Sequence, residues 1–482
     1  MEKPFYGSRD PIAALATPLA ESALAIIRTS GNENCEKGDF RSGDSGAIRI
    51  LAKIFSRPKA LLAAGGNSIV HGWILEPADG KKLDEVLVSV YRAPKSYSGE
   101  DSADISCHGG VAAVKAVMSA LKKAGFREAL PGEFTFRAFM NGKLDLTRAE
   151  SVMELVAAKT GRGREQAVKR LLGVLEKEIS EIKNMLMELL AAAEIYLDYS
   201  EDEFLAPDDE SEGRLPRRKN AEEAIARLKT LANLWSSERI YAEGAQAVLA
   251  GLPNAGKSSL FNMLIREDRS IVTGVPGTTR DWIEEVISVE DIPLRLIDTA
   301  GLKSFSVAEC DEAERIGVKR SLDFLKQSDL VLYIIDGEKG ITEEDKKFLF
   351  EHRKESRPLI MVWNKADLAP PEENSGLIAV SAKTGEGIPL LMHSIAGHLI
   401  KGHKPLSTDD AAAGPGTPRQ KELLDAALAS VEEALALADG GEPLDIIAPQ
   451  IRAAVNALGE ITGEVSNDGL LELMFSRFCV GK

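Results

Sequence analysis

One stretch of the chain has the residue types and spacing needed to bind a nucleoside triphosphate. Residues 251–258, Gly-Leu-Pro-Asn-Ala-Gly-Lys-Ser, fit the pattern G-x-x-x-x-G-K-[ST] and directly follow the strand-like segment AQAVLAG. Glycines allow a tight turn whose backbone N–H groups face the phosphates. Lys257 would reach the β- and γ-phosphates, and Ser258 would supply a hydroxyl to Mg²⁺. The alternative is a glycine-rich strand-to-helix turn without a ligand, and the motifs that follow argue against it.

Four further motifs follow in the order expected of a GTPase. Thr279 in GTTRD is a candidate second Mg²⁺ ligand, and the hairpin-like pair IEEVISV and PLRLIDTAG would bring Asp298 to the outer shell of the metal. The strand-like PLIMVWN leads into Asn364-Lys365-Ala366-Asp367, where the two carboxylate oxygens of Asp367 match the N1–H and N2 amino group of guanine. Adenine lacks that donor pair, and such a mismatch is worth roughly four orders of magnitude in selectivity. In VSAK, residues 380–383, a backbone amide can bind the guanine oxygen.

The residue after the DTAG glycine raises a question about hydrolysis. In the Ras type of GTPase a glutamine at this position orients the attacking water. Here the residue is Leu302, which neither donates nor accepts a hydrogen bond. If the chain hydrolyses GTP, another group must hold the water.

The bulk composition is that of a globular protein. With 482 residues, 44% hydrophobic and 28% charged, the chain should form about three domains with sizeable cores. No apolar run approaches the ~20 residues that cross a bilayer, and the N-terminus lacks the basic and apolar regions of a signal peptide. We therefore expect no membrane contact and a cytoplasmic location. The net charge of −16 argues against broad non-specific nucleic-acid affinity, since phosphate neutralisation dominates duplex binding.

The cysteines are widely scattered and form no C-x-x-C pair, which argues against a disulfide framework and against a structural zinc site. We expect reduced thiols at all four positions: Cys35, Cys107, Cys310 and Cys479.

Periodicity divides the chain into three domains. Residues 1–142 alternate short β-like runs with Gly/Pro punctuation and one helical stretch at 110–125, which indicates an α+β module. Residues 143–242 and 401–482 have helical periodicity, and residues 243–400 carry the nucleotide motifs. The sequence thus predicts an α/β P-loop GTPase domain, of the Ras-like type, inserted in an all-α helical domain and preceded by the α+β domain.

The helical domain is predicted from a cap and two apolar stripes. Thr147-x-x-Glu150 has the form of a capping box that starts a helix. One stripe then follows the spacing of a long amphipathic helix: Val168, Leu171, Leu172, Leu175, Ile179, Ile182, Leu186 and Leu189. A second stripe beyond residue 420 offers it a partner: Leu424, Leu428, Val431 and Leu435.

Several motifs together resemble the MnmE/TrmE family of GTPases, which act in modification of the tRNA wobble uridine. These are GLPNAGKSSLFN, TGVPGTTRD, DTAGL, DEAERIG and the terminal RFCVGK, with SYSGEDSADISCHGG and PGEFTFRAFMNGKLDLTRAES in the N-terminal part. The resemblance covers the whole chain. It implies addition of a carboxymethylaminomethyl-type group at C5 of the uridine, with GTP hydrolysis driving movement of the G domains.

The resemblance also implies how hydrolysis proceeds without a glutamine. In this family K⁺ replaces an arginine finger when two G domains meet. Its ligands here would be the Asn254 side chain, the carbonyls of Thr273 and Val275, and Thr278. The catalytic, water-positioning acid would be Glu314, which without the resemblance reads as a solvated helix residue.

The nucleotide, Mg²⁺ and K⁺ site implied by these motifs comprises the following residues: Asn254, Ala255, Gly256, Lys257, Ser258, Ser259, Thr273, Gly274, Val275, Pro276, Gly277, Thr278, Thr279, Asp298, Thr299, Ala300, Gly301, Asn364, Lys365, Asp367, Ser381, Ala382 and Lys383.

The family binds 5-formyltetrahydrofolate in its N-terminal domain, with 5,10-methylenetetrahydrofolate as another possible one-carbon donor. The matching positions are Arg28, Asp104, Lys143 and the terminal Lys482. A carboxylate suits the aminopyrimidone edge of a pterin, and cations suit the glutamate tail; taken singly, these residues would be surface ion pairs. Asp104 replaces the usual glutamate and is one methylene shorter. Cys479, which sequence alone would make a small buried hydrophobe, becomes a candidate of unknown role near the folate.

The partners implied are a second copy of the chain, joined through the N-terminal domain, an FAD protein of the MnmG (GidA) type in a heterotetramer, and tRNA. The alternative function is a regulatory GTPase of the ribosome-assembly kind. That alternative predicts an attached RNA-binding domain, such as a KH module with its GXXG loop, and a basic surface.

Overall fold

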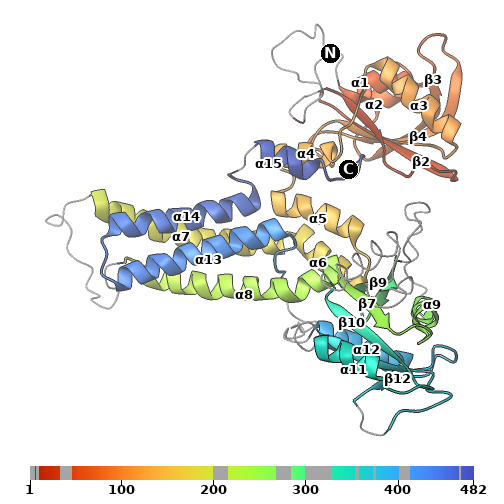
Figure 1. Cartoon of the computed structure of the whole chain (residues 1–482). Coiled ribbons are helices and arrows are strands. Elements are labelled where there is room, and N and C mark those ends of the chain that lie inside the picture. Colours follow the sequence, from red (N-terminus) through yellow and green to blue (C-terminus); the bar gives the residue numbers. More distant parts are fainter. Residues whose placement is uncertain are drawn as a thin grey trace, which may run out of the picture. The chain divides into compact units, whose positions relative to one another are not determined.

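The chain forms two compact units, one of Met1–Met153 with Leu458–Lys482 and one of Glu154–Ala457. The computed structural model (Figure 1) describes residues 6, 10–32, 46–198, 215–267, 284–298, 328–352, 358–372, 376–400, 413–465 and 468–481. Among the described helices, none combines the length and apolarity that crossing a membrane requires.

A six-stranded sheet forms the centre of the N-terminal unit. Its strands are β1 Ile12–Leu15, β2 Leu24–Ser30, β3 Ser68–Leu75, β4 Lys82–Tyr91, β5 Ser102–His108 and β6 Arg127–Glu128. The order is β3-β4-β5-β2-β1-β6, and all neighbours are antiparallel except β1 and β6.

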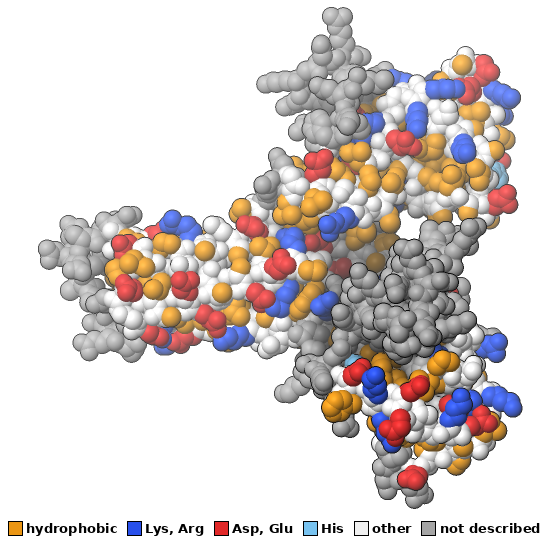
Figure 2. All heavy atoms as spheres, viewed as in Figure 1, with side chains coloured by type: hydrophobic (Ala, Val, Ile, Leu, Met, Phe, Trp, Pro, Cys, Tyr) orange, Lys and Arg blue, Asp and Glu red, His pale blue; other side chains and the backbone are white. Residues whose placement is uncertain are grey.

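One face of this sheet is covered by helices and the other presents apolar side chains. The helix expected at 110–125 is confirmed as α3 Val111–Ala124, and two short helices that the sequence did not predict, α1 Ala47–Ala52 and α2 Pro58–Ala63, join it in the core. On the strands, side chains alternate between the faces. The open face carries four exposed apolar residues, Leu24, Ile26, Ile69 and Leu87, and Figure 2 shows hydrophobic side chains gathered where Figure 1 labels β2 and β4.

The end of the chain packs into this N-terminal unit through aromatic rings. Helix α4 Glu133–Met140 meets α15 Asp468–Phe475, and the ring of Phe136 lies 5.4 Å from those of both Tyr6 and Phe475. The terminal helix is thus fixed to the N-terminal unit by apolar burial.

Helix α5 Leu146–Ala157 corrects the predicted capping box. Thr147 lies inside the helix, and the cap is Asp145, whose Oδ1 accepts hydrogen bonds from the backbone N–H of Thr147 at 2.8 Å and of Arg148 at 3.2 Å. A carboxylate two residues before the predicted cap therefore satisfies free backbone donors of the first helical turn, and the helix begins one residue earlier than the predicted cap.

The second unit contains the helices α6 Gly161–Leu171, α7 Val174–Asp198, α8 Arg218–Glu243, α13 Pro418–Asp439 and α14 Leu444–Thr462, the last of which continues into the other unit. Helices α7, α8, α13 and α14 run side by side (Figure 1), with α8 packed against both α7 and α13 and Arg452 of α14 paired with Glu194 of α7. The helical domain interrupted by the G domain is therefore confirmed.

The single long helix predicted from residue 168 is wrong. The chain breaks after α6 at Gly173, whose φ of +87° suits the glycine that ends a helix, and Leu172 is 73% exposed. From α7 onward the predicted stripe holds, since these residues are fully buried: Leu175, Ile179, Ile182, Leu186 and Leu189.

The inserted G domain is a six-stranded sheet buried on both faces. Its strands are β7 Ala245–Gly251, β8 Glu284–Val289, β9 Ile292–Asp298, β10 Leu330–Asp336, β11 Leu359–Asn364 and β12 Ile378–Ala379. The order is β12-β11-β10-β7-β9-β8, and only the predicted hairpin β8–β9 is antiparallel.

Helices α9 Lys257–Glu267 and α12 Ile388–Leu399 contribute to the core on one face of this sheet, and α11 Glu343–His352 packs on the other. This double cover explains why its parallel strands read as continuous apolar runs.

Candidate functional site

The loop between β7 and α9 requires glycine at both ends. At Gly251 a Cβ would lie 2.3 Å from the carbonyl oxygen of Ile334, and at Gly256 it would lie 2.2 Å from Nδ2 of Asn364. Both residues have positive φ, +144° and +89°, which favours glycine further. The strand–loop–helix order expected of a phosphate-binding loop is therefore present.

Lys257 folds back over this loop. Its Nζ donates hydrogen bonds to the carbonyl oxygens of Gly251 and Leu252, both at 2.9 Å. Burial lowers the pKa of Lys257 below its usual 10.5, and the nearby negative charge of Asp298 opposes that shift. The ammonium is thus held beside the loop by two carbonyls, whose neutral dipoles compensate only part of its lost hydration.

Ser258 and Asp298 meet although they come from different motifs. The hydroxyl of Ser258 donates to Oδ2 of Asp298 at 2.8 Å, because β7, which precedes α9, and β9, which ends at Asp298, are neighbours in the sheet. A hydroxyl and a carboxylate are oxygen ligands of the kind that Mg²⁺ takes, directly or through water, so these residues fit that ion.

The guanine motif is built at the ends of the neighbouring strands. Asn364 is buried at the end of β11. Its Nδ2 donates to the Ala255 carbonyl at 2.9 Å, and its Oδ1 accepts from the N–H of Ala382 at 3.1 Å. One side chain therefore ties the phosphate loop to both guanine loops. Asp367 is exposed, and Ser381 is fully buried.

Two acidic residues that the sequence reading missed hold Lys365. Its Nζ lies 2.9 Å from Oδ2 of Asp336 and 2.8 Å from Oε2 of Glu338. Both contacts raise the pKa of Lys365, and the hydrogen bond to Glu338 has the larger effect. The sequence signal that could have found Asp336 is its position at the end of the apolar strand LVLYIID.

The remaining predicted residues of the nucleotide site lie outside the described residues: Thr273, Gly274, Val275, Pro276, Gly277, Thr278, Thr279, Thr299, Ala300, Gly301 and Glu314. Of the described ones, Asn254 and Ser259 are exposed and Ala255 is buried, while Lys383 is exposed beside Ala382.

A pocket of about 210 Å³ opens on the N-terminal sheet. Arg28 and Asp104 lie at opposed positions of β2 and β5, and Nε of Arg28 is 3.0 Å from Oδ1 of Asp104. The guanidinium also donates to the carbonyl of Gly481 at 3.3 Å. The full lining is Arg28, Tyr91, Tyr97, Ser98, Ser102, Asp104 and Phe134, of which the sequence reading named only Arg28 and Asp104.

The other residues predicted for this pocket are placed differently. Nζ of Lys143 donates to the carbonyl of Pro94 at 3.0 Å, and Lys143 is not among the lining residues. Lys482 lies outside the described residues. Cys479 is exposed, and its carbonyl accepts from the N–H of Gly132 at 3.3 Å. By contrast, burial raises the pKa of the Cys107 thiol to about 11, so that thiol is unreactive.

Comparison with known proteins decides the family. Residues 11–143 match the model of the GTP-binding protein TrmE N-terminus, and residues 146–479 match that of the MnmE helical domain. The tRNA modification GTPase MnmE of Treponema denticola is 42% identical over 99% of both chains, and that of Carboxydothermus hydrogenoformans is 38% identical over 98% of this chain and 99% of that one. The chain belongs to the MnmE/TrmE family.

MnmE proteins are tRNA modification GTPases, so this family member is an enzyme that binds GTP and hydrolyses it. Among solved structures, the G domain of the FeoB iron transporter of T. maritima is 25% identical and covers 32% of this chain and 98% of that chain, with a TM-score of 0.25.

Proposed function

We propose that this chain is a K⁺-stimulated GTP hydrolase that acts in the cytoplasm in C5 modification of the tRNA wobble uridine. It adds a carboxymethylaminomethyl-type group, with a tetrahydrofolate as one-carbon donor and an FAD protein of the MnmG type as partner. The observation that carries the proposal is the contact between Ser258 and Asp298, which brings together two groups that a GTPase uses around Mg²⁺.

The residues of the nucleotide site take distinct roles. Lys257 moves from its loop carbonyls to the β- and γ-phosphates, and Asp367 selects guanine. Ser258 and Thr279 hold Mg²⁺ with Asp298 in its outer shell, while Asn254, Thr273, Val275 and Thr278 hold K⁺; these ions supply positive charge to the phosphates. Glu314 orients the attacking water in place of the missing glutamine.

The chemistry of the N-terminal pocket suits part of a folate. The carboxylate of Asp104 can accept hydrogen bonds from an aminopyrimidone edge, and the rings of Tyr91, Tyr97 and Phe134 offer apolar contact. Since Arg28 and Asp104 are already paired, a ligand must exchange that ion pair for its own hydrogen bonds. A volume of about 210 Å³ is below the ~300 to 1,000 Å³ of pockets that enclose a drug-sized ligand.

A second copy of the chain would enlarge this pocket. The open sheet face that carries Arg28 and Asp104 also carries the exposed side chains of Leu24, Ile26, Ile69 and Leu87. An apolar group of this kind on one face favours burial against a partner. We therefore assign the sheet face to the homodimer contact.

Labelled folate tests the one-carbon assignment. The wild-type chain, its flavoprotein partner, tRNA, GTP, glycine as the source of the carboxymethylamino part and 5,10-methylenetetrahydrofolate labelled at the methylene carbon should transfer the label to the wobble uridine. A Ser258→Ala variant, in which hydrolysis fails, is the matched control and should give little label. Modified uridine without label would contradict the folate assignment, and equal labelling by the variant would contradict a role for GTP hydrolysis.

A further inference from the structure

Helix α4 contacts the loop before β5 that contains Tyr97, Ser98 and Gly99, and the first two of these residues line the pocket. Phe134 of this helix lines the pocket itself, the hydroxyl of Thr135 lies 2.9 Å from that of Tyr97, and Asn141, just after the helix, donates to the carbonyl of Ser98 at 2.8 Å. At Gly99, which has φ of +79°, a Cβ would lie 2.9 Å from that of Asn141. The loop therefore lies directly against α4.

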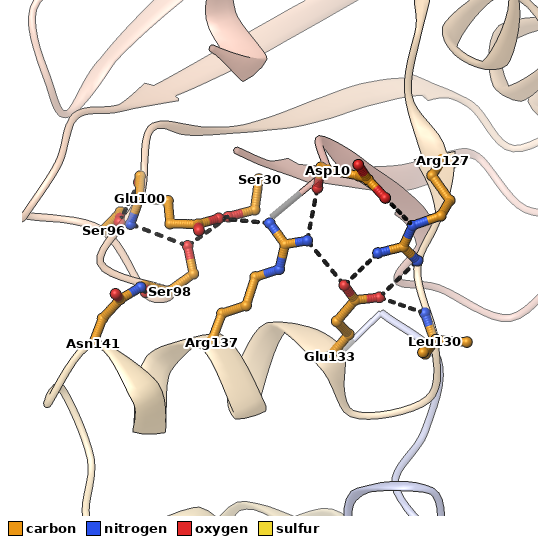
Figure 3. A network of polar contacts seen from close by, with 10 residues as sticks. All are labelled: Asp10, Ser30, Ser96, Ser98, Glu100, Arg127, Leu130, Glu133, Arg137 and Asn141. Atoms are coloured by element: carbon orange, nitrogen blue, oxygen red, sulfur yellow. Dashed lines mark hydrogen bonds and ion pairs between the residues drawn. The ribbon is translucent and has the colours of Figure 1, made fainter. Parts of the chain in front are cut away.

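A series of buried polar groups runs from Arg137 of α4 to Ser98 (Figure 3), which lines the pocket. Nη1 of Arg137 donates to Oε2 of Glu100 at 2.9 Å, and the hydroxyl of Ser30 donates to the same oxygen at 2.8 Å. The hydroxyls of Ser30 and Ser98 are 2.6 Å apart. Arg137, Glu100, Ser30 and Ser98 are all buried, and we refer to them as the Arg137–Ser98 chain.

The order of groups fixes the direction of each hydrogen bond. A guanidinium only donates and an ionised carboxylate only accepts, so the proton of Ser30 points toward Glu100. The oxygen of Ser30 must then accept the proton of Ser98. The Ser98 hydroxyl oxygen also accepts from the N–H of Glu100 at 3.4 Å. Since Ser98 lines the pocket, the second lone pair of that oxygen remains for a ligand there.

We propose that Ser30, Glu100 and Arg137 are positioning residues that make Ser98 a hydrogen-bond acceptor toward the pocket, and so favour a ligand that presents an N–H donor there. The inference rests on the proposed folate site, since an aminopyrimidone edge carries such donors. A serine hydroxyl free to rotate would present a proton or a lone pair equally well. The Arg137–Ser98 chain removes that ambiguity before the ligand binds.

The other end of the network, around Glu133, holds the helix in place and contains no residue that lines the pocket. Glu133, fully buried, accepts from Arg127 at 2.6 Å and from Arg137 at 2.9 Å, and also from the N–H of Leu130 at 2.8 Å. These contacts hold the start of α4 and do not reach the lining residues. Arg137 is the residue that joins this end of the network to Glu100.

A pair of hydroxyl deletions separates positioning from stability. Ser30→Ala removes the acceptor of the Ser98 proton. Thr29→Val removes a neighbouring buried hydroxyl that, among the described residues, bonds to the backbone of Ala103 alone, at 3.1 and 3.2 Å. We expect Ser30→Ala to weaken binding of 5-formyltetrahydrofolate by about five- to tenfold, the scale of one neutral hydrogen bond, and Thr29→Val to leave it unchanged. Both should unfold within a similar range of urea concentration.

A double-mutant cycle tests the route through Ser98. If Ser30 acts through Ser98, the Ser30→Ala/Ser98→Ala variant should bind the probe as Ser98→Ala alone does. Additive losses, or wild-type affinity in Ser30→Ala, would overturn the inference while leaving the folate site intact. Absence of binding by the wild-type homodimer would overturn the folate assignment itself, and this inference with it.

Discussion

Ser258, in the first turn of α9, donates its hydroxyl proton to the carboxylate of Asp298, 40 residues later in the chain and 2.8 Å away. The contact joins the phosphate loop to the DTAG loop. It also places the buried ammonium of Lys257 near the charge of Asp298, which affects the pKa of Lys257. These polar groups therefore lie against one another in the structure.

Binding of GTP should take up protons at alkaline pH. Burial lowers the pKa of Lys257 below 10.5 in the free protein, whereas a triphosphate favours the ammonium and raises that pKa. Between these two values binding adds a proton, so affinity falls as the pH rises through this window. Calorimetry in two buffers of different ionisation enthalpy measures the uptake. Lys257→Arg, which stays charged, should show none; the same uptake in that variant would assign the proton elsewhere.

Potassium should accelerate hydrolysis. An arginine finger supplies roughly 10³- to 10⁵-fold, and K⁺ in its place should supply part of that. GTPase rates in K⁺ and Na⁺ at matched ionic strength give the test, and equal rates would remove this mechanism. Asn254 has φ of +66°, a conformation that asparagine and aspartate tolerate. Asn254→Ala should abolish the cation preference, while Asn254→Asp, with an oxygen ligand and the same backbone tolerance, should retain more of it.

Nucleotide choice should follow Asp367. Asp367→Asn replaces one acceptor oxygen with an amide donor, which should weaken GTP binding and favour xanthine, whose C2 oxygen accepts that bond. Competition between GTP and XTP measures the change. Because Asn364 and Lys365 hold this loop through hydrogen bonds to Ala255 and Asp336, the backbone should be preserved in this variant. Continued preference for guanine would show that the base is recognised elsewhere.

Glu314 should act on the transition state. Glu314→Ala should leave GTP affinity near normal and reduce kcat by about 10²-fold or more, the scale for losing a positioned acid or base. Single-turnover hydrolysis together with nucleotide affinity measures both quantities. Glu312→Ala, which removes the neighbouring acid, is the control and should be close to wild type. Normal turnover in Glu314→Ala would assign the water to another group, and lost affinity would indicate a damaged fold.

The G-domain fold could be read from the sequence because its signals are local. The phosphate loop, the DTAG motif and the NKAD motif each come at the end of an apolar run, and those runs are the strands β7, β9 and β11 of one sheet. The start of helix α5 was ambiguous because two nearby residues could each cap it. Both Asp145 and Thr147 are capping types, and only the structure shows that Asp145 reaches the free N–H groups.

The N-terminal pocket was only partly predictable. Its lining comes from β2, β4, β5, α4 and the loop before β5, so no single motif contains it. Tyr97 and Ser98 occur in SYSGEDS, but their roles depend on contacts with Thr135 and Ser30. Such contacts join residues distant in sequence, and periodicity carries no information about them.

The most direct test of the account is the wobble-uridine content of tRNA from cells that lack this chain, measured by nucleoside mass spectrometry. The account predicts loss of the carboxymethylaminomethyl-type uridine, with recovery on return of the wild-type chain and no recovery with Ser258→Ala at equal protein level. A normal content of that nucleoside in cells lacking the chain would contradict the account.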